Sequence, residues 1–412
     1  MAKEIRIEEG KLKVIFEIRD NGVVELKQFD PAGRADVRER KREAEDFYPI
    51  TEVQMTGRGS RGMHAYKHNV SGGATDFTYQ SHEILENEKG KELVIHTATE
   101  YGVKAEYHMQ FFTGVAAVQV WTVLKNEGTE AIGLEYISSF IYQGLCQSGE
   151  KPYFEKTSVY TPHNSWDCES QWRKNDCREI NLSGMAINGF NTPGFGMNRY
   201  CYGGHSSWST CEYLPMGICE DTECKETYFF QIEHSGQWLI EYGPSSGERL
   251  YVALSGATEA EHGWWKNLKP GDTFTTVPAG FGVADGGVNE AIAELTGYRR
   301  KIRRPNEDDE KLNVVFNDYM NCLMGDPTEE KEKAIIDKAA EMGCEYYCLD
   351  CGWYDKGFWW DRVGEWKESP ERFPNTLKAV CDYAKEKGMV MGLWLEIEVM
   401  GVACELVNKL PD

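Results

Sequence analysis

The first two thirds of the chain consist of short segments in which apolar and polar residues alternate or β-branched residues cluster. Separated by NG, GG, EG and SG pairs, such segments are typical of β-strands joined by tight turns. They cover residues 11–18, 22–29, 91–98, 116–126, 228–234, 238–243 and 249–256, and we expect 268–287 to add a last hairpin and strand. No long helical period interrupts them, so the pattern predicts an antiparallel β-sandwich, larger than an ordinary one, over residues 1–287.

The pattern changes after this segment. Ala291, Leu295 and Tyr298 recur near helical spacing, and a basic cluster follows them just before Pro305. These features predict a linker helix and a charged hinge over residues 288–310, with the arginines on a solvated helix face.

Residues 311–412 alternate between strand and helix patterns. The expected order is strand 311–320, helix 326–343, strand 344–350, helix 373–388 and strand 389–396. For the first helix, Asp326 is the expected cap and Gly343 the stop. The alternation predicts a parallel sheet, namely the first three units of a TIM-type (β/α) barrel. A closed barrel needs about 250 residues, so we expect the barrel to be incomplete in this chain.

Composition limits the function. A length of 412 residues suits two domains, and the net charge of −22 argues against nucleic acid or an anionic membrane surface as partner. The N-terminus has no apolar signal segment and no run is long enough to span a bilayer, which predicts a cytoplasmic protein. Thirteen cysteines, an odd number with irregular spacing, indicate reduced thiols rather than disulfides.

Three of these cysteines have a C-x3-C-x2-C spacing like that of iron–sulfur enzymes. Cys344, Cys348 and Cys351 fall along a predicted strand, however, which would separate the first and last by about 20 Å. Ligands of one cluster must converge, so we disfavour this interpretation. No metal or other cofactor is expected.

Carboxylates and aromatic residues collect where the predicted strands end. Asp350 follows the second strand of the 311–412 region, whereas Trp394 and Glu396 end the third. The neighbouring candidates are Trp353, Tyr354, Trp359, Trp360, Trp366 and Glu398. Parallel barrels bind ligands at this end of their strands, and carboxylates with aromatic faces suit a neutral sugar. Each residue alone could be a helix cap or a packing side chain; their joint placement favours a site most strongly for Asp350 and Trp394.

Five ordered motifs carry a resemblance to a known family. They are FNDYMN (316–321), LDCGWY (349–354), VGEW (363–366), RFPNTL (372–377) and GLWLEIEVMG (392–401). Together with TEVQMTG (51–57) and the 268–287 segment, they resemble glycoside hydrolase family 36, the melibiase-type α-galactosidases. The resemblance implies that residues 1–287 form that family's large antiparallel β-supersandwich. The resemblance covers most of the chain and identifies it with the N-terminal part of that family.

The resemblance implies retaining hydrolysis of terminal α-linked galactose from oligosaccharides by two carboxylates about 5 Å apart. In that family the nucleophile follows strand four and the acid/base follows strand six, so both are expected beyond Asp412, and the chain as given is expected to be inactive. The residues expected to bind the sugar are Asp350, Trp394, Trp353, Tyr319, Cys351, Trp366 and Glu396. Cys351 stands where the family has a second aspartate and Tyr319 where it has a tryptophan, which puts strict galactose selectivity in doubt.

Two further possibilities stay open. The chain could be a non-catalytic carbohydrate-binding or interaction protein of the same ancestry, and it could be a homo-oligomer. The polar segment 163–177, with Trp166 and Trp172, could cap the barrel mouth or be a self-packed surface loop.

Overall fold

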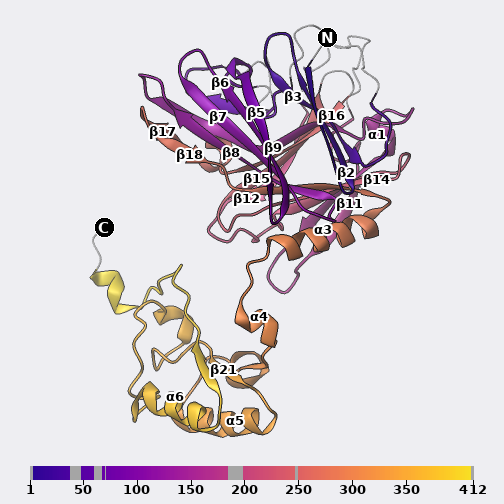
Figure 1. The fold of residues 1–412 in the computed structure, drawn as a ribbon. Coiled ribbons are helices and arrows are strands. Elements are labelled where there is room, and N and C mark those ends of the chain that lie inside the picture. The colour runs from indigo at the N-terminus through magenta and orange to yellow at the C-terminus, as the bar shows by residue number, and fades with distance from the viewer. Residues whose placement is uncertain are drawn as a thin grey trace. The chain divides into compact units, whose positions relative to one another are not determined.

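The chain folds into two units that divide between Arg303 and Arg304 (Figure 1). The structure, a computed structural model, describes residues 3–37, 48–59, 67–69, 71–183, 198–245 and 249–409. Because the relative placement of the two units is not determined, each is described by itself.

Antiparallel strands dominate the first unit. They are β1 (Lys3–Glu9), β2 (Leu12–Ile18), β3 (Val24–Pro31), β4 (Val53–Met55), β5 (Thr78–Asn87), β6 (Gly90–Ala98), β7 (Val103–Phe111), β8 (Ala117–Asn126), β9 (Ile132–Leu145), β10 (Thr157–His163), β11 (Gln171–Asp176), β12 (Tyr200–Gly204), β13 (Met216–Asp221), β14 (Glu226–Ile232), β15 (Trp238–Ser245), β16 (Arg249–Gly256), β17 (Lys266–Leu268), β18 (Thr273–Thr275) and β19 (Ala279–Asp285). Three short helices accompany them: η1 (Ala74–Asp76), α1 (Tyr153–Lys156) and α2 (Glu259–His262).

These strands form three sheets. One has the order β1-β2-β3; a second runs β11-β10-β13-β14-β19-β8-β7-β6-β5, with β18 paired to β8; a third runs β12-β15-β16-β9-β17, with β4 paired to β9. All the pairs recorded for this unit are antiparallel, as the short alternating segments predicted.

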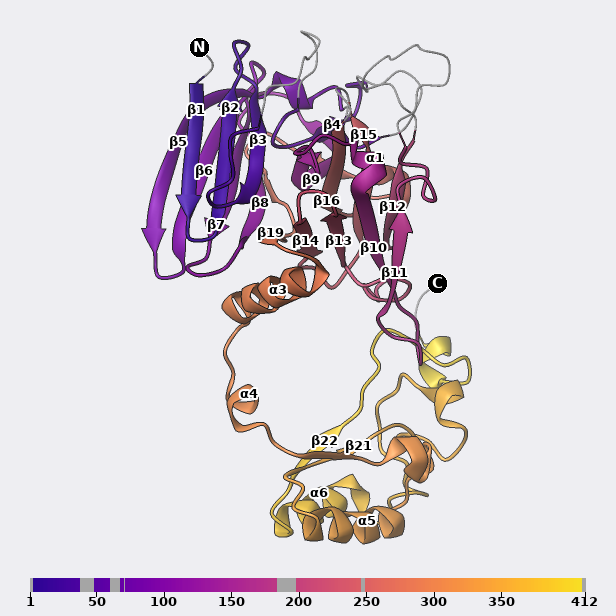
Figure 2. The same ribbon diagram turned by 90° about the vertical axis from the view of Figure 1, so that its right-hand side faces the viewer.

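A shared aromatic core holds the three sheets together. Phe281 of β19 lies at its centre, with its ring centroid 4.9 Å from that of Phe29 on β3 and 4.3 Å from that of Phe140 on β9. Phe16 of β2 likewise meets Tyr107 of β7 at 6.1 Å. Because each sheet contributes side chains to one core, the unit is a β-sandwich, and Figure 2 shows β1–β3 lying in front of β5–β7.

Two details differ from the sequence expectation. The segment 268–287 does not form a hairpin, because β18 and β19 both pair with β8 and lie one after the other along it. Residues 171–176 form a strand, β11, which pairs with β10 at the edge of its sheet and has mostly exposed side chains.

Helix α3 (Val288–Ile302) follows the last strand and lies against the sandwich (Figure 1). Its apolar positions Ala291, Leu295 and Tyr298 are buried in a cluster with Phe112 and Phe229. The Tyr298 hydroxyl donates a 2.5 Å hydrogen bond to Glu233. The helical spacing seen in the sequence therefore marks a face that packs on the sheet.

The second unit contains a three-stranded parallel sheet. Its elements are α4 (Glu307–Lys311), β20 (Val315–Asn317), η2 (Tyr319–Leu323), α5 (Glu329–Glu341), β21 (Tyr346–Leu349), η3 (Trp359–Arg362), α6 (Thr376–Glu386), β22 (Val390–Leu393) and η4 (Glu405–Asn408). The strand order is β20-β21-β22, with both pairs parallel. Helices α5 and α6 lie together on one face of this sheet (Figure 2).

Helix α5 starts later than the sequence suggested. Its N-cap is Thr328, whose hydroxyl accepts a hydrogen bond from the Lys331 amide, so the expected Asp326 cap is wrong. The Asp326 carboxylate instead accepts a 2.7 Å hydrogen bond from the buried Arg372 guanidinium. Arg372 also binds carbonyls of residues 327 and 355–357, which ties the loop after β21 to the start of α5.

Within the residues described, no helix is long and apolar enough to cross a membrane.

Candidate functional site

Asp350 lies directly after β21, where hydrogen bonds fix its side chain and its backbone. One carboxylate oxygen accepts a 2.8 Å hydrogen bond from the side-chain amide of Asn317, at the end of β20. The other accepts one of 2.8 Å from the Cys351 amide. The Asp350 amide in turn donates a 2.7 Å hydrogen bond to Asp318. Carboxylate oxygens have further acceptor capacity, so this partly exposed, fixed group can still bind a ligand hydroxyl.

A buried acid pair lies behind Asp350. Asp318 is 2% exposed and Glu332 of α5 is 0% exposed, and the charge of Asp318 is near enough to act on the Glu332 carboxyl. The Tyr347 hydroxyl donates a 2.6 Å hydrogen bond to Glu332. Burial first, and then the charge of Asp318, raises the pKa of Glu332 to about 8. Two neighbouring carboxyls that are buried together oppose each other's ionisation.

The aromatic residues predicted from the sequence form one cluster beside Asp350. Trp366 contacts Trp353, Tyr354 and Trp394 at centroid distances of 5.9, 4.9 and 5.8 Å. Trp394 also meets Trp359 edge-to-face at 5.7 Å. The Trp353 indole donates a 3.2 Å hydrogen bond to the Trp394 carbonyl, which joins the loops after β21 and β22. The cluster is thus a fixed apolar wall at the C-terminal edge of the sheet.

Tyr319 and Cys351 belong to the same neighbourhood. The Tyr319 ring meets Trp359 edge-to-face at 5.8 Å and is partly exposed. Cys351 is only 2% exposed, and burial, with Asp350 beside it, raises the pKa of its thiol. A Cβ at Gly325 would lie 2.4 Å from Trp359 and 3.0 Å from the Cys351 sulfur, so glycine at position 325 lets these side chains pack. Cys351 therefore lines the base of this wall as a neutral, apolar group.

Glu396 lies after β22 and is partly buried. Burial, and then the neighbouring charge of Glu398, raises its carboxyl pKa. Its side chain makes no hydrogen bond or ion pair within the part of the chain that is described. Of the seven predicted sugar-binding residues, Asp350, Trp394, Trp366 and Trp353 lie in the hydrogen-bonded and stacked cluster, Tyr319 and Cys351 adjoin it, and Glu396 lies two residues beyond it.

The sequence argument missed three polar residues of this site: Asn317, Asp318 and Glu332. Asn317 and Asp318 fall inside the FNDYMN motif, but only their contacts with Asp350 reveal a role. Glu332 sits on the buried face of α5 among Ile336 and Ala339. A glutamate at an otherwise apolar position of that helix was the available signal.

One group of side chains in the described residues has metal-ligand geometry, and it lies in the sandwich unit. Ligand atoms of Asp221, Glu223 and Cys224 are within 4.8 Å of one another. The Lys156 ammonium lies 2.6 Å from Asp221 and 3.5 Å from Glu223. Burial also raises the pKa of the Cys224 thiol to about 11. Because a lysine fills the cation position and the thiol is neutral, these residues form a buried ion pair and do not fit a metal ion.

Known proteins match both the sequence and the fold. A family model described as Melibiase matches residues 273–412. This range includes the rim around Asp350, by which we mean Asp350 with Asn317, Tyr319, Cys351 and the aromatic cluster of Trp353, Tyr354, Trp359, Trp366 and Trp394. The α-galactosidase Mel36A of Lactobacillus acidophilus is 25% identical over 383 residues, covering 89% of this chain and 47% of that protein. The α-galactosidase AgaA of Geobacillus stearothermophilus is 29% identical over 191 residues, covering 45% of this chain and 25% of AgaA. In these matches the chain resembles glycoside hydrolase family 36, the melibiase-type α-galactosidases.

Solved structures of family 36 proteins share its fold. The crystal structure of AgaA superposes with a TM-score of 0.79 at 18% identity, covering 100% of this chain and 58% of AgaA. The chain matches the N-terminal part of its family 36 relatives and spans about half the length of Mel36A. The resemblance inferred from the sequence motifs is confirmed.

Proposed function

We propose that this chain is the N-terminal part of a retaining α-galactosidase that removes terminal α-linked galactose from oligosaccharides. In this proposal the β20–β22 sheet is the start of a (β/α) barrel, and its C-terminal edge holds one side of the galactose ring. The observation that carries the proposal is the oriented Asp350 carboxylate beside the Trp353–Trp366–Trp394 wall. AgaA, a relative of this chain, has been crystallised with raffinose and with stachyose, which supports α-galactosides as the ligand class.

Each part of the rim has a distinct role in the proposal. The Asp350 carboxylate accepts hydrogen bonds from ring hydroxyls, and Asn317 holds it in the orientation that this needs. Trp394 and Tyr319 cover the apolar C–H face of the sugar. Cys351 offers no strong acceptor, which relaxes the discrimination between galactose and related α-sugars such as N-acetylgalactosamine. The nucleophile and the acid/base are expected beyond Asp412, so the 412-residue chain binds but does not cleave.

A nitrophenyl α-galactoside assay with galactose calorimetry tests this proposal. The chain should give no turnover above background and should bind galactose weakly. Asp350→Asn, which keeps the shape but removes the charge, should weaken binding about ten-fold or more, equivalent to about 1.4 kcal/mol. Asp382→Asn is the matched control, because Asp382 is exposed on α6 and its one ion pair among the described residues is with Lys378.

The outcomes separate the alternatives. Turnover that survives purification would show that the catalytic carboxylates lie within residues 1–412. Galactose binding that is equal in wild type and Asp350→Asn would remove Asp350 from the site. A chain that binds sugar through Asp350, and stays inactive when expressed with whatever sequence follows residue 412, would favour the non-catalytic alternative.

A further inference from the structure

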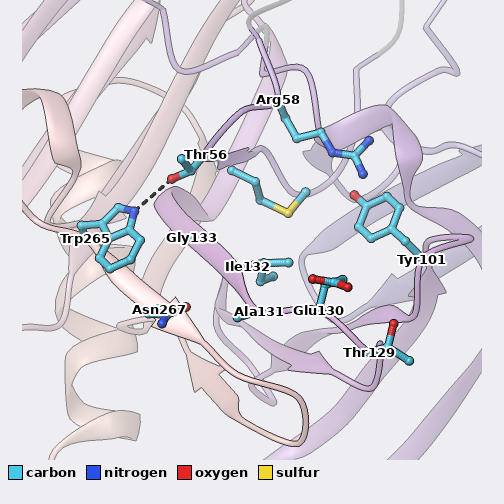
Figure 3. A pocket seen from close by; sticks show the side chains of 11 residues that line it. Thr56, Arg58, Tyr101, Thr129, Glu130, Ala131, Ile132, Gly133, Trp265 and Asn267 are labelled. Atoms are coloured by element: carbon cyan, nitrogen blue, oxygen red, sulfur yellow. Dashed lines mark hydrogen bonds between the residues drawn. The ribbon is translucent and has the colours of Figure 1, made fainter.

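A pocket on the sandwich unit, separate from the rim around Asp350, has the features of a sugar-binding site. It has a volume of about 540 Å³, within the range of about 300–1,000 Å³ typical of small-molecule sites. Its walls come from the end of β4, the β6–β7 turn, the β8–β9 connection and β17. Figure 3 shows Trp265 and Asn267 on one side, and Arg58 and Tyr101 on the other.

Trp265 is held in place although half of it is exposed. Its indole N–H donates a 2.9 Å hydrogen bond to Thr56, whose hydroxyl donates to Glu135 at 2.7 Å. A Cβ at Gly133 would lie 2.8 Å from the indole and 2.4 Å from the Thr56 hydroxyl, so glycine is needed for this approach. An aromatic side chain that is 51% exposed but fixed by its neighbours loses little freedom when a ligand stacks on it.

The opposite wall is fixed as well, and its charge is neutralised. The Arg58 guanidinium lies over the Tyr101 ring at 4.2 Å. Both side chains bind one oxygen of Asp76, each at 3.1 Å. Because Arg58 is paired in this way, the wall presents a flat, nearly neutral surface and does not select an anion.

Three polar side chains of the pocket remain available. Thr129, Glu130 and Asn267 are exposed, and their side chains make no hydrogen bond or ion pair within the part of the chain that the structure describes. They offer a hydroxyl, a carboxylate and an amide, which together can donate to and accept from neighbouring sugar hydroxyls. An uncompensated carboxylate also disfavours an anionic ligand. The lining thus divides into a fixed aromatic scaffold and free hydrogen-bonding groups.

We propose that this pocket is a second carbohydrate site, in which a neutral mono- or disaccharide unit stacks on Trp265 and hydrogen-bonds to Glu130 and Asn267. The site lies entirely within the sandwich unit and uses no residue of the Asp350 rim. It would retain an oligosaccharide on the protein independently of any cleavage.

Fluorine NMR of the full chain labelled with 5-fluorotryptophan tests the proposal directly. The Trp265→Phe variant identifies the Trp265 resonance among the twelve tryptophans. Titration with raffinose should shift this resonance in a saturable way, both in wild type and in Asp350→Asn. In calorimetry of the Asp350→Asn protein, Trp265→Ala should weaken the residual raffinose binding about ten-fold or more. Trp208→Ala is the matched control, because Trp208 is 49% exposed on the same unit but outside the pocket.

A second variant separates a sugar site from a folding defect. Gly133→Ala removes no polar group but displaces Trp265 and Thr56, so it should weaken raffinose binding while the melting temperature shows that the unit is folded. The proposal is overturned if the Trp265 resonance does not move with raffinose, or if its shift disappears in Asp350→Asn. It is also overturned if Trp265→Ala leaves sugar binding unchanged and alters the sedimentation coefficient instead, because the pocket is then an interface between copies of the chain.

Discussion

The strands of the sandwich and those of the parallel sheet in the second unit are covered very differently. Strands β2, β14 and β15 of the sandwich are buried at every residue. In the second unit, α5 and α6 cover one face of the β20–β22 sheet, whereas Val315 and Val390 on its edge strands are 60% and 54% exposed. Parallel sheets are stable when both faces are covered. These sandwich strands are therefore covered within their own unit, while the parallel sheet exposes apolar surface that the described residues do not cover.

The two units also differ in the surroundings of one buried glutamate each. In the sandwich, Glu241 is fully buried but accepts hydrogen bonds from His68, Tyr251 and Arg199. Burial alone would raise its pKa, yet these partners, His68 foremost, lower it to about 2. In the second unit, Glu332 meets another carboxyl, and its pKa is raised to about 8. The buried Glu241 thus stabilises the sandwich above pH 4.5, whereas the buried Glu332 destabilises the second unit there.

The largest expected effect on stability comes from a substitution in the core of the sandwich. Phe281→Ala removes the ring at the centre of the three sheets and should lower the free energy of unfolding of the sandwich by about 3–5 kcal/mol, through lost burial and a cavity. Val315→Ala, at an exposed position of β20, should change stability by less than about 0.5 kcal/mol. Urea unfolding of both variants measures this. Comparable losses would mean that the exposed face of β20 is covered in solution.

In the sandwich, the burial pattern of single elements could be predicted from the sequence, whereas the pairing of distant strands could not. Strand β8 and the apolar face of α3 carry their burial pattern in the sequence, because their neighbours are close along the chain. The pairing of both β18 and β19 with β8 could not be predicted, since it depends on which distant strand completes the sheet.

At the candidate site, composition predicted the kinds of residue but not their partners. Asp350 and the tryptophans stood out because carboxylates and aromatic residues at strand ends are informative by themselves. The contacts of Asn317, Asp318 and Glu332 stayed hidden because they join residues 15 to 33 positions apart through folded geometry. The Trp265 pocket stayed hidden for the same reason, because its lining comes from four separate segments.

The next effect concerns pH. Since the pKa of Glu332 is higher in the folded chain than its usual value of 4.5, the folded state binds more protons between about pH 4.5 and 8. Its contribution to stability therefore falls as pH rises through this window. The groups that face it are Asp318, the Tyr347 hydroxyl, Cys322 and, more distantly, Lys331. Glu241 has the opposite sign, because its stabilisation is lost as pH falls from 4.5 towards 2.

Glu332→Gln tests this sign, because glutamine mimics the protonated acid and still accepts from Tyr347. The variant should equal wild type near pH 4.5 and be more stable at pH 8.5. The full shift of the Glu332 pKa from 4.5 to about 8 corresponds to roughly 5 kcal/mol at about 1.4 kcal/mol per pKa unit. Relaxation and water penetration around the buried charge should reduce the measured gain to on the order of 2 kcal/mol. Urea midpoints at the two pH values measure the difference. Glu341→Gln is the matched control, since Glu341 is exposed on the same helix and, within the part of the chain that the structure describes, forms an ion pair with Lys338 alone. A Glu332→Gln variant that loses stability at pH 8.5 would show that the carboxylate is paired with a cation there.

The smallest effect concerns the start of α5, one of the two helices that cover the parallel sheet. Thr328→Ala removes the hydroxyl that accepts from the Lys331 amide and should cost about 1 kcal/mol, whereas Thr328→Ser keeps the cap and should cost little. Amide exchange at residues 329–333 should quicken in the alanine variant alone. Because no second helical layer lies behind α5 in the described residues, this loss should extend to the amides of β21. If faster exchange is confined to the first turn of α5, the parallel sheet is stable without a fully formed α5. The two units would then differ less in how far their strands depend on the elements that cover them.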